Sequence, residues 1–176
     1  MVALFSSDVT IELLRIFLLL FILLPAAMED YRTKKVPNGL SMVGWVLGPV
    51  LHLSLLGVDG LLTSAEGFLW LFLITFPLWL LGWLGAADVK LMSSVGAIVG
   101  AGSALVVLIA IFITGLIFAV VVSLYRGDLA NVVSRLYYAA LFRNTAEIKG
   151  QGGGAHLPYA IPIAFGSLFG MLYLQL

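Results

Sequence analysis

The chain is organised as six apolar segments separated by short polar stretches. A helix that crosses about 30 Å of hydrocarbon needs roughly 20 mostly apolar residues, and somewhat fewer when flanking groups reach the interface. The segments run approximately over residues 12–28, 40–56, 67–84, 88–101, 103–124 and 157–174, and the fourth is the shortest. This pattern predicts an all-α, polytopic membrane bundle of six transmembrane helices that forms one membrane domain over residues 1–176.

The charged residues between these segments are distributed asymmetrically. Loops that stay in the cytoplasm carry an excess of Lys and Arg. In the alternating topology, one side holds Arg32, Lys34, Lys35, Lys90, Arg126, Arg135, Arg143 and Lys149, and the other holds Asp8, Glu12, Asp59 and Glu66. We therefore expect both termini outside. Arg15 is the exception, and its place three residues after Glu12 predicts an ion pair or a side chain that snorkels to the interface.

The longest connection covers residues 125–156, and its first part is amphipathic. Apolar side chains recur at helical spacing from Leu129 to Leu141, which predicts an interfacial helix over about 129–142 on the inner leaflet. Glycines at 150 and 152–154 then break the helix. Two interpretations stay open: a helix that covers the bundle, and one that gates the entry of a substrate.

Composition excludes several classes of protein. Hydrophobic residues make up 62% of the chain and charged residues 10%, and mean hydropathy is +1.14, well outside the range of soluble domains. Nine basic residues offset nine acidic ones, so the net charge gives no reason to expect a nucleic-acid partner. The absence of cysteine excludes disulfides, thiolate nucleophiles and zinc sites built on Cys. We expect neither a metal nor a cofactor.

Two acidic residues are candidates for chemistry because ionisable groups beside membrane spans are costly. Asp30 follows the first segment and Asp88 opens the fourth. Two crossings separate them, which returns the chain to the same, cytoplasmic side. Two carboxyl groups within hydrogen-bonding reach share a proton and supply an acid and a base together. The small residues Gly85, Ala86 and Ala87 leave room for an extended peptide to approach Asp88.

Each acid also has a simpler interpretation. Asp88 is well placed to be an N-cap, since its side chain accepts hydrogen bonds from free backbone N–H groups. Asp30 is equally compatible with a solvated acid in a charged loop. Two other classes of function stay open: a small ion-coupled transporter, which predicts acids near the bilayer midplane, and a non-enzymatic partner in pilus or secretion assembly, which tolerates changes of both aspartates.

The residues around both acids resemble the type IV prepilin peptidase family, the membrane aspartic proteases of the GxGD class. In that family an Asp after a span is followed by basic residues and a Pro-Asn pair, as in DYRTKKVPN at 30–38. A second Asp follows a glycine motif and precedes Val-Lys-Leu, as in GAADVKL at 85–91. A Pro-Tyr near the start of the last span matches LPYAIP at 157–162.

The resemblance implies that Asp30 and Asp88 are the catalytic pair of a peptidase. It makes Lys90 either a group that neutralises charge near the pair or a cytoplasmic anchor, and Asn38 most simply a cap of the second segment. Ala87 replaces the second glycine of the motif, and we expect its methyl group to tune the fit of the backbone without abolishing activity.

The resemblance also indicates the substrate. The chain has neither the cysteine-rich insertion nor any cysteine of the larger bacterial members, so it is similar to the short, peptidase-only subtype of Flp and tight-adherence systems. The implied substrate is a prepilin whose short basic leader is removed at the cytoplasmic face of the bacterial inner membrane. A preflagellin peptidase of archaeal type is the alternative, and the sequence leaves the oligomeric state open.

Other small and polar residues are assigned to packing. Gly96 and Gly100, and likewise Gly166 and Gly170, have the four-residue spacing that lets membrane helices approach closely. His52 is expected in the outer half of the second segment, remote from the aspartates.

Overall fold

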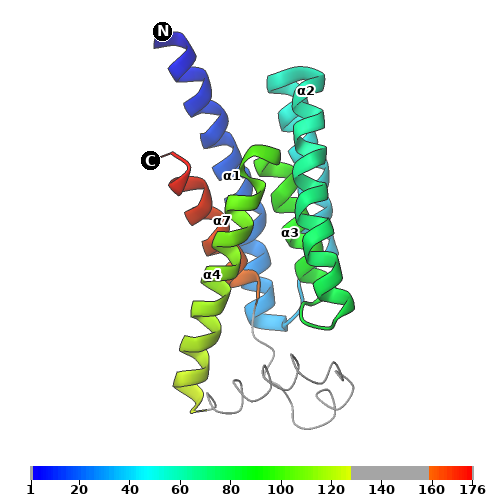
Figure 1. Ribbon diagram of the computed structural model, residues 1–176, viewed down its shortest axis with the longest axis vertical. Helices are drawn as coiled ribbons and strands as arrows, with labels where there is room; N and C mark the ends of the chain where they lie inside the picture. The colour runs from blue at the N-terminus through cyan, green and yellow to red at the C-terminus, as the bar shows by residue number, and fades with distance from the viewer. Residues whose placement is uncertain (1, 128–158, 176) are drawn as a thin grey trace.

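In a computed structural model, which describes residues 2–127 and 159–175, the chain forms a bundle of helices (Figure 1). The helices are α1 (Val2–Thr33), α2 (Asn38–Leu80), α3 (Ala86–Val99), α4 (Ala101–Arg126) and α7 (Ala160–Tyr173). The expectation of an all-helical protein is therefore confirmed for the described residues. The amphipathic helix predicted over about 129–142 lies outside them.

Within residues 2–127 and 159–175, three helices are long and apolar enough to cross a membrane. They comprise residues 9–33 of α1, 38–80 of α2 and 101–125 of α4, whereas α3 and α7 have 14 residues each. Helix α2 contains the second predicted segment and most of the third, because it runs to one end of the bundle and returns (Figure 1). The reversal includes Gly57, whose φ of +67° is readily adopted by glycine alone. Six separate crossings and the sidedness of the termini stay predictions.

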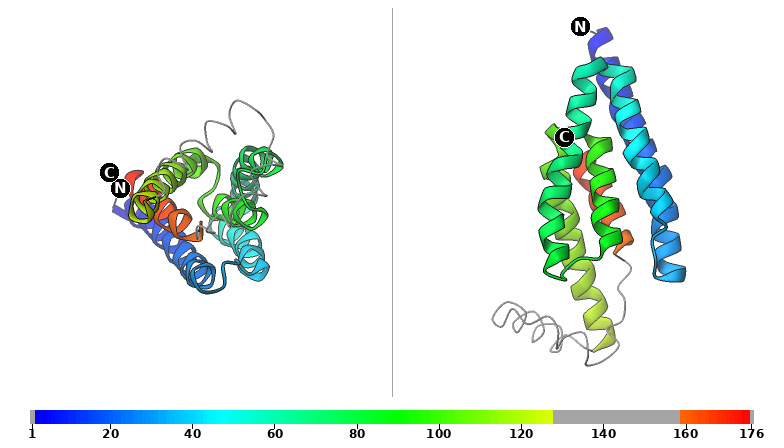
Figure 2. Two further views of the ribbon diagram at one scale, coloured as in Figure 1. Left: turned by 90° about the horizontal axis from the view of Figure 1, so that it is seen from below. Right: turned by 90° about the vertical axis from the view of Figure 1, so that its right-hand side faces the viewer.

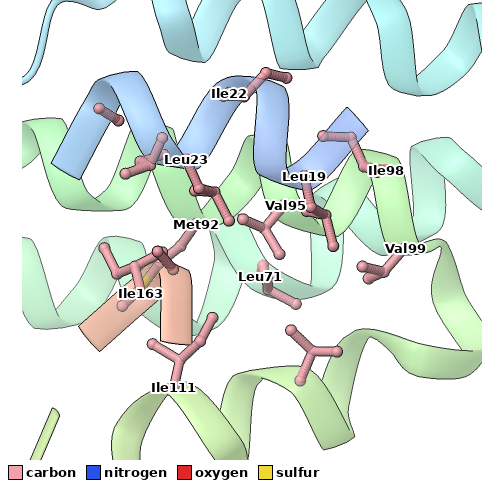
Figure 3. Packing of buried hydrophobic residues seen from close by; sticks show 14 of the residues in the cluster. Leu19, Ile22, Leu23, Leu71, Met92, Val95, Ile98, Val99, Ile111 and Ile163 are labelled. Carbon is pink, nitrogen blue, oxygen red and sulfur yellow. The ribbon is translucent and has the colours of Figure 1, made fainter. Parts of the chain in front are cut away.

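Helix α3 is the centre of the bundle. Every residue from Leu91 to Val99 is buried, and Figure 3 shows side chains from the other helices gathered around it. The core includes Leu19, Ile22 and Leu23 of α1, Leu71 of α2, Met92, Val95 and Ile98 of α3, Ile111 of α4 and Ile163 of α7. Lipid tails are as apolar as these side chains, so close van der Waals packing, not expulsion of water, has to hold such a core together.

Glycines allow the backbones to meet. Gly96 of α3 lies against Gly67 of α2, and a methyl group at either position would collide with the carbonyl of the other. Gly166 of α7 faces Ile111, and a Cβ at Gly170 would lie 2.9 Å from Val107 Cα. The predicted packing role is confirmed at these positions. At Gly100 the predicted packing role was incomplete. That residue also forms the break between α3 and α4, where its φ is +77°.

The far end of α3 stops inside the bundle. Fourteen residues make a helix of about 21 Å, shorter than the hydrocarbon core. Backbone carbonyls at this end of α3 would cost free energy if they had no hydrogen-bond partner within the hydrocarbon layer. The Ser64 hydroxyl donates to Ala97 O at 2.6 Å, and His52 Nε2 donates to Ile98 O at 2.9 Å. His52 is thus explained as a structural hydrogen-bond donor. The Ile98 carbonyl that it binds lies ten residues after Asp88 along α3.

Replacing His52 by leucine is therefore expected to destabilise the fold. His52 is only 1% exposed, and leucine would leave the Ile98 carbonyl without this donor, which costs about 1–3 kcal/mol. Thermal unfolding in detergent measures the effect. Ser54→Ala is the control, because that hydroxyl bonds within its own helix to Leu51 O. Equal stability of the two variants would show that the donor is dispensable.

In the first half of α1, Arg15 Nη1 donates to Glu12 Oε1 at 2.6 Å. This confirms the predicted ion pair. The pair accounts for the one cation on the predominantly acidic side of the sequence pattern.

Candidate active site

Asp30 lies in the last turn of α1 and is 2% exposed. Its interpretation as a solvated loop acid is therefore wrong. An acid in this position is disfavoured by the negative end of its own helix. The carboxylate instead accepts a hydrogen bond at Oδ2 from the backbone N–H of Ala160, at 3.0 Å. Ala160 begins α7, where backbone N–H groups lack partners within their own helix, so the acid of one helix is held by the start of another.

Asp88 lies in the first turn of α3, where an acid is favoured. The N-cap position belongs to Gly85, three residues earlier, and not to Asp88 as the simpler interpretation proposed. The Asp88 side chain still closes the turn, because its Oδ2 accepts the Gly85 N–H at 3.2 Å. A Cβ at Gly85 would lie 2.8 Å from that oxygen, so glycine permits the approach.

The two acids line one cavity of about 350 Å³. Its wall consists of Asp30 in the last turn of α1, Lys34, Lys35 and Val36 after that helix, and Gly85, Ala86, Ala87 and Asp88 at the start of α3. The two connections lie at the same end of the bundle (Figures 1 and 2). The count of crossings therefore correctly predicted that the two acids lie at the same end of the bundle. Each carboxylate has one oxygen fixed by a backbone N–H, which favours a defined orientation of both.

Lys90 does not line this cavity. Its ammonium donates to Asn38 Oδ1 at 3.1 Å, which ties the second turn of α3 to the start of α2. The expectation that Asn38 caps its helix is wrong: Pro37 is the N-cap, and no side chain makes a capping hydrogen bond there. Because the extended Pro37 precedes it, Asn38 is already helical, and its amide reaches α3 instead.

The beginning of α7 contributes groups whose roles the sequence did not indicate. Tyr159 precedes Ala160 and is partly buried at the start of the helix. Its ring lies next to Gly115 of α4, where a Cβ would contact Tyr159 Cε1 at 3.8 Å. The motif at 157–162 drew attention to this segment, but nothing local indicates that the amide of Ala160 serves an acid 130 residues earlier.

The site does not resemble a metal centre. Over residues 2–127 and 159–175, no three His, Asp or Glu side chains gather in a way that could hold a metal ion. The expectation of neither metal nor cofactor is untested by this observation and stays a prediction.

The sequence matches the model of one protein family. A model of the type IV leader peptidase family matches residues 17–120, a range that includes both Asp30 and Asp88. Comparison with curated proteins and with solved structures gave no match.

Proposed function

The chain belongs to the type IV leader peptidase family, and from this premise we propose that it is an aspartic endopeptidase that removes the leader of a prepilin. Membership makes it a protease, and its long apolar helices indicate a membrane protein. The observation that carries the aspartic mechanism is the single cavity shared by Asp30 and Asp88.

The mechanism uses water as the nucleophile. One carboxylate takes a proton from water as its oxygen attacks the peptide carbonyl carbon, while the protonated partner donates a hydrogen bond to the carbonyl oxygen. The tetrahedral intermediate then collapses, the carbon–nitrogen bond breaks, and the leaving amine takes up a proton from the pair. One water is consumed and the two acids return to sharing one proton. The backbone N–H groups of Ala160 and Gly85 support this by fixing the carboxylates.

The substrate and location follow from the sequence. We infer a prepilin of Flp type with a short basic leader, because these 176 residues contain none of the cysteines of the larger bacterial members. The site would face the cytoplasm of a bacterial inner membrane, since Lys34 and Lys35 lie beside it and basic residues mark that side. Six crossings with both termini outside complete this arrangement.

Cleavage by the purified protein tests the proposal. The chain in lipid vesicles is incubated with a Flp-type prepilin and, separately, with a preflagellin, and the product masses identify the bond that is cut. We expect release of the intact leader from the prepilin. No cleavage of either substrate by a folded protein would exclude the function, and cleavage of preflagellin alone would change the substrate class.

Gly85→Ala is expected to reduce kcat by about tenfold to a hundredfold, because a displacement of about 1 Å in a catalytic group has effects of that size. The new methyl would push the Asp88 carboxylate away, while the extended backbone at Gly85 (φ −76°, ψ 149°) accepts alanine. Gly39→Ala is the matched control, since no atom lies within 4 Å of a Cβ there. Equal rates for the two variants would contradict the role of this contact.

A further inference from the structure

The turn after α1 has an unusual backbone. Lys34 has φ +56°, in the left-handed region, and its N–H donates to Asp30 O at 2.9 Å. This hydrogen bond is the standard ending of a helix whose next residue is left-handed, a position that glycine usually fills. A lysine there is strained by its Cβ. Residues held in such a conformation gather at functional sites, which directs attention to the lysine side chain.

The same turn is fixed by further contacts. The Thr33 hydroxyl donates to Glu29 O at 2.9 Å and to Lys35 O at 3.1 Å, and Val36 is 9% exposed. These contacts hold the backbone of the lysine pair in place. Both lysines line the cavity that contains Asp30 and Asp88, so two positively charged residues form part of its wall.

The charges of this cavity select what can enter it. If the aspartates share a proton, as the proposed function requires, they carry one negative charge against two positive charges of the lysines. A basic peptide segment would be repelled from the lysine side, and a segment with a carboxylate would be attracted. A prepilin with a basic leader therefore has to bind with the leader directed away from Lys34 and Lys35.

We propose that Lys34 and Lys35 form a subsite for an acidic side chain of the substrate, in the segment that follows the scissile bond. The inference rests on the proposed function, and it adds a determinant of specificity and a direction in which the peptide lies. Contact of these lysines with anionic lipid headgroups is the competing explanation, which an experiment can separate.

The experiment compares two prepilin peptides that differ only in a Glu or a Gln within the first few residues after the cleaved bond. We expect the wild-type protein to cleave the Glu peptide with a kcat/KM about twofold to fivefold higher, mainly through KM, since one partly exposed charge pair has effects of this size. The preference should decline as salt is raised.

The double variant Lys34→Gly, Lys35→Gln should lose this preference, so that its kcat/KM for the Glu peptide falls to its value for the Gln peptide. Glycine adopts φ +56° without strain, so the fold is expected to tolerate the change, and thermal unfolding checks it. Lys90→Gln is the matched control, because its ammonium bonds Asn38 outside the cavity wall, and it should keep the preference.

Three results would overturn the inference. An unchanged Glu preference in the double variant would exclude the subsite. An equal loss on both peptides would show that the lysines act on the aspartate pair. A loss that appears in vesicles with phosphatidylglycerol but not in phosphatidylcholine alone would assign the lysines to the membrane. If the wild-type protein cleaves neither peptide, the proposed function itself fails, a result distinct from these three.

Discussion

Replacing either Asp30 or Asp88 by asparagine will lower the rate of leader cleavage by about a hundredfold to ten-thousandfold, the range that acid–base catalysis contributes. Asparagine keeps the size of the side chain but can neither take a proton from water nor give one back. The fold should survive in both variants, because the amide oxygen still accepts the N–H of Ala160 or Gly85. Purified variants and a prepilin, followed by mass, measure the effect.

Two further substitutions control for general loss of negative charge. Glu29→Gln changes the acid next to Asp30 in sequence, and Asp59→Asn changes an acid in the part of α2 that follows its reversal. Both are expected to cleave at the wild-type rate. Full activity of Asp30→Asn or Asp88→Asn would remove that residue from the mechanism, and equal losses in all four variants would point to a general charge effect.

The second large effect is on folding. Gly96→Val should destabilise the bundle by about 1–3 kcal/mol, the usual cost of overpacking. The new Cβ would collide with the Gly67 carbonyl and would lie 3.2 Å from Leu71 Cβ. A backbone carbonyl cannot rotate away as a side chain can. Helix α3 would have to move away from α2, and Asp88 at its start would move with it. Thermal unfolding in detergent and cleavage rate should both fall.

Gly102→Val is the matched control for Gly96→Val. It places the same side chain in the first turn of α4, where no atom lies within 4 Å of a Cβ. The two variants share the loss of glycine and the gain of a β-branched residue, so a difference between them isolates the contact with α2. Equal stability of both proteins would show that the bundle can open at this point without cost.

Periodicity and charge were sufficient to predict features that depend on local sequence. The apolar segments became helices, Arg15 paired with Glu12 three residues away, and Gly96 and Gly166 faced neighbouring backbones. The shared side of Asp30 and Asp88 needed only a count of crossings between them. These inferences worked because each rests on helix geometry or on the cost of charge in lipid.

Contacts between distant segments could not be predicted in this way. Asn38 looked like a cap in the sequence, but its partner is the Lys90 ammonium, 52 residues later. His52 and Ser64 end α3 from another helix, and their role depends on how short α3 is within the bundle. Neither relation leaves a periodic or local signal, since each arises only when the helices pack.

The hydrogen bond between Asp30 and Ala160 has a consequence for biosynthesis. The acceptor is made early and the donor 130 residues later, so a growing chain carries an incomplete site until α7 has joined α1. Translation at about 5–20 residues per second separates these events by roughly 7–26 seconds. In the part of that interval that follows the synthesis of Asp88, the ribosome-bound chain has both acids but not this hydrogen bond. Coupling the candidate site to α7 thereby delays its ordering until α7 has packed against α1.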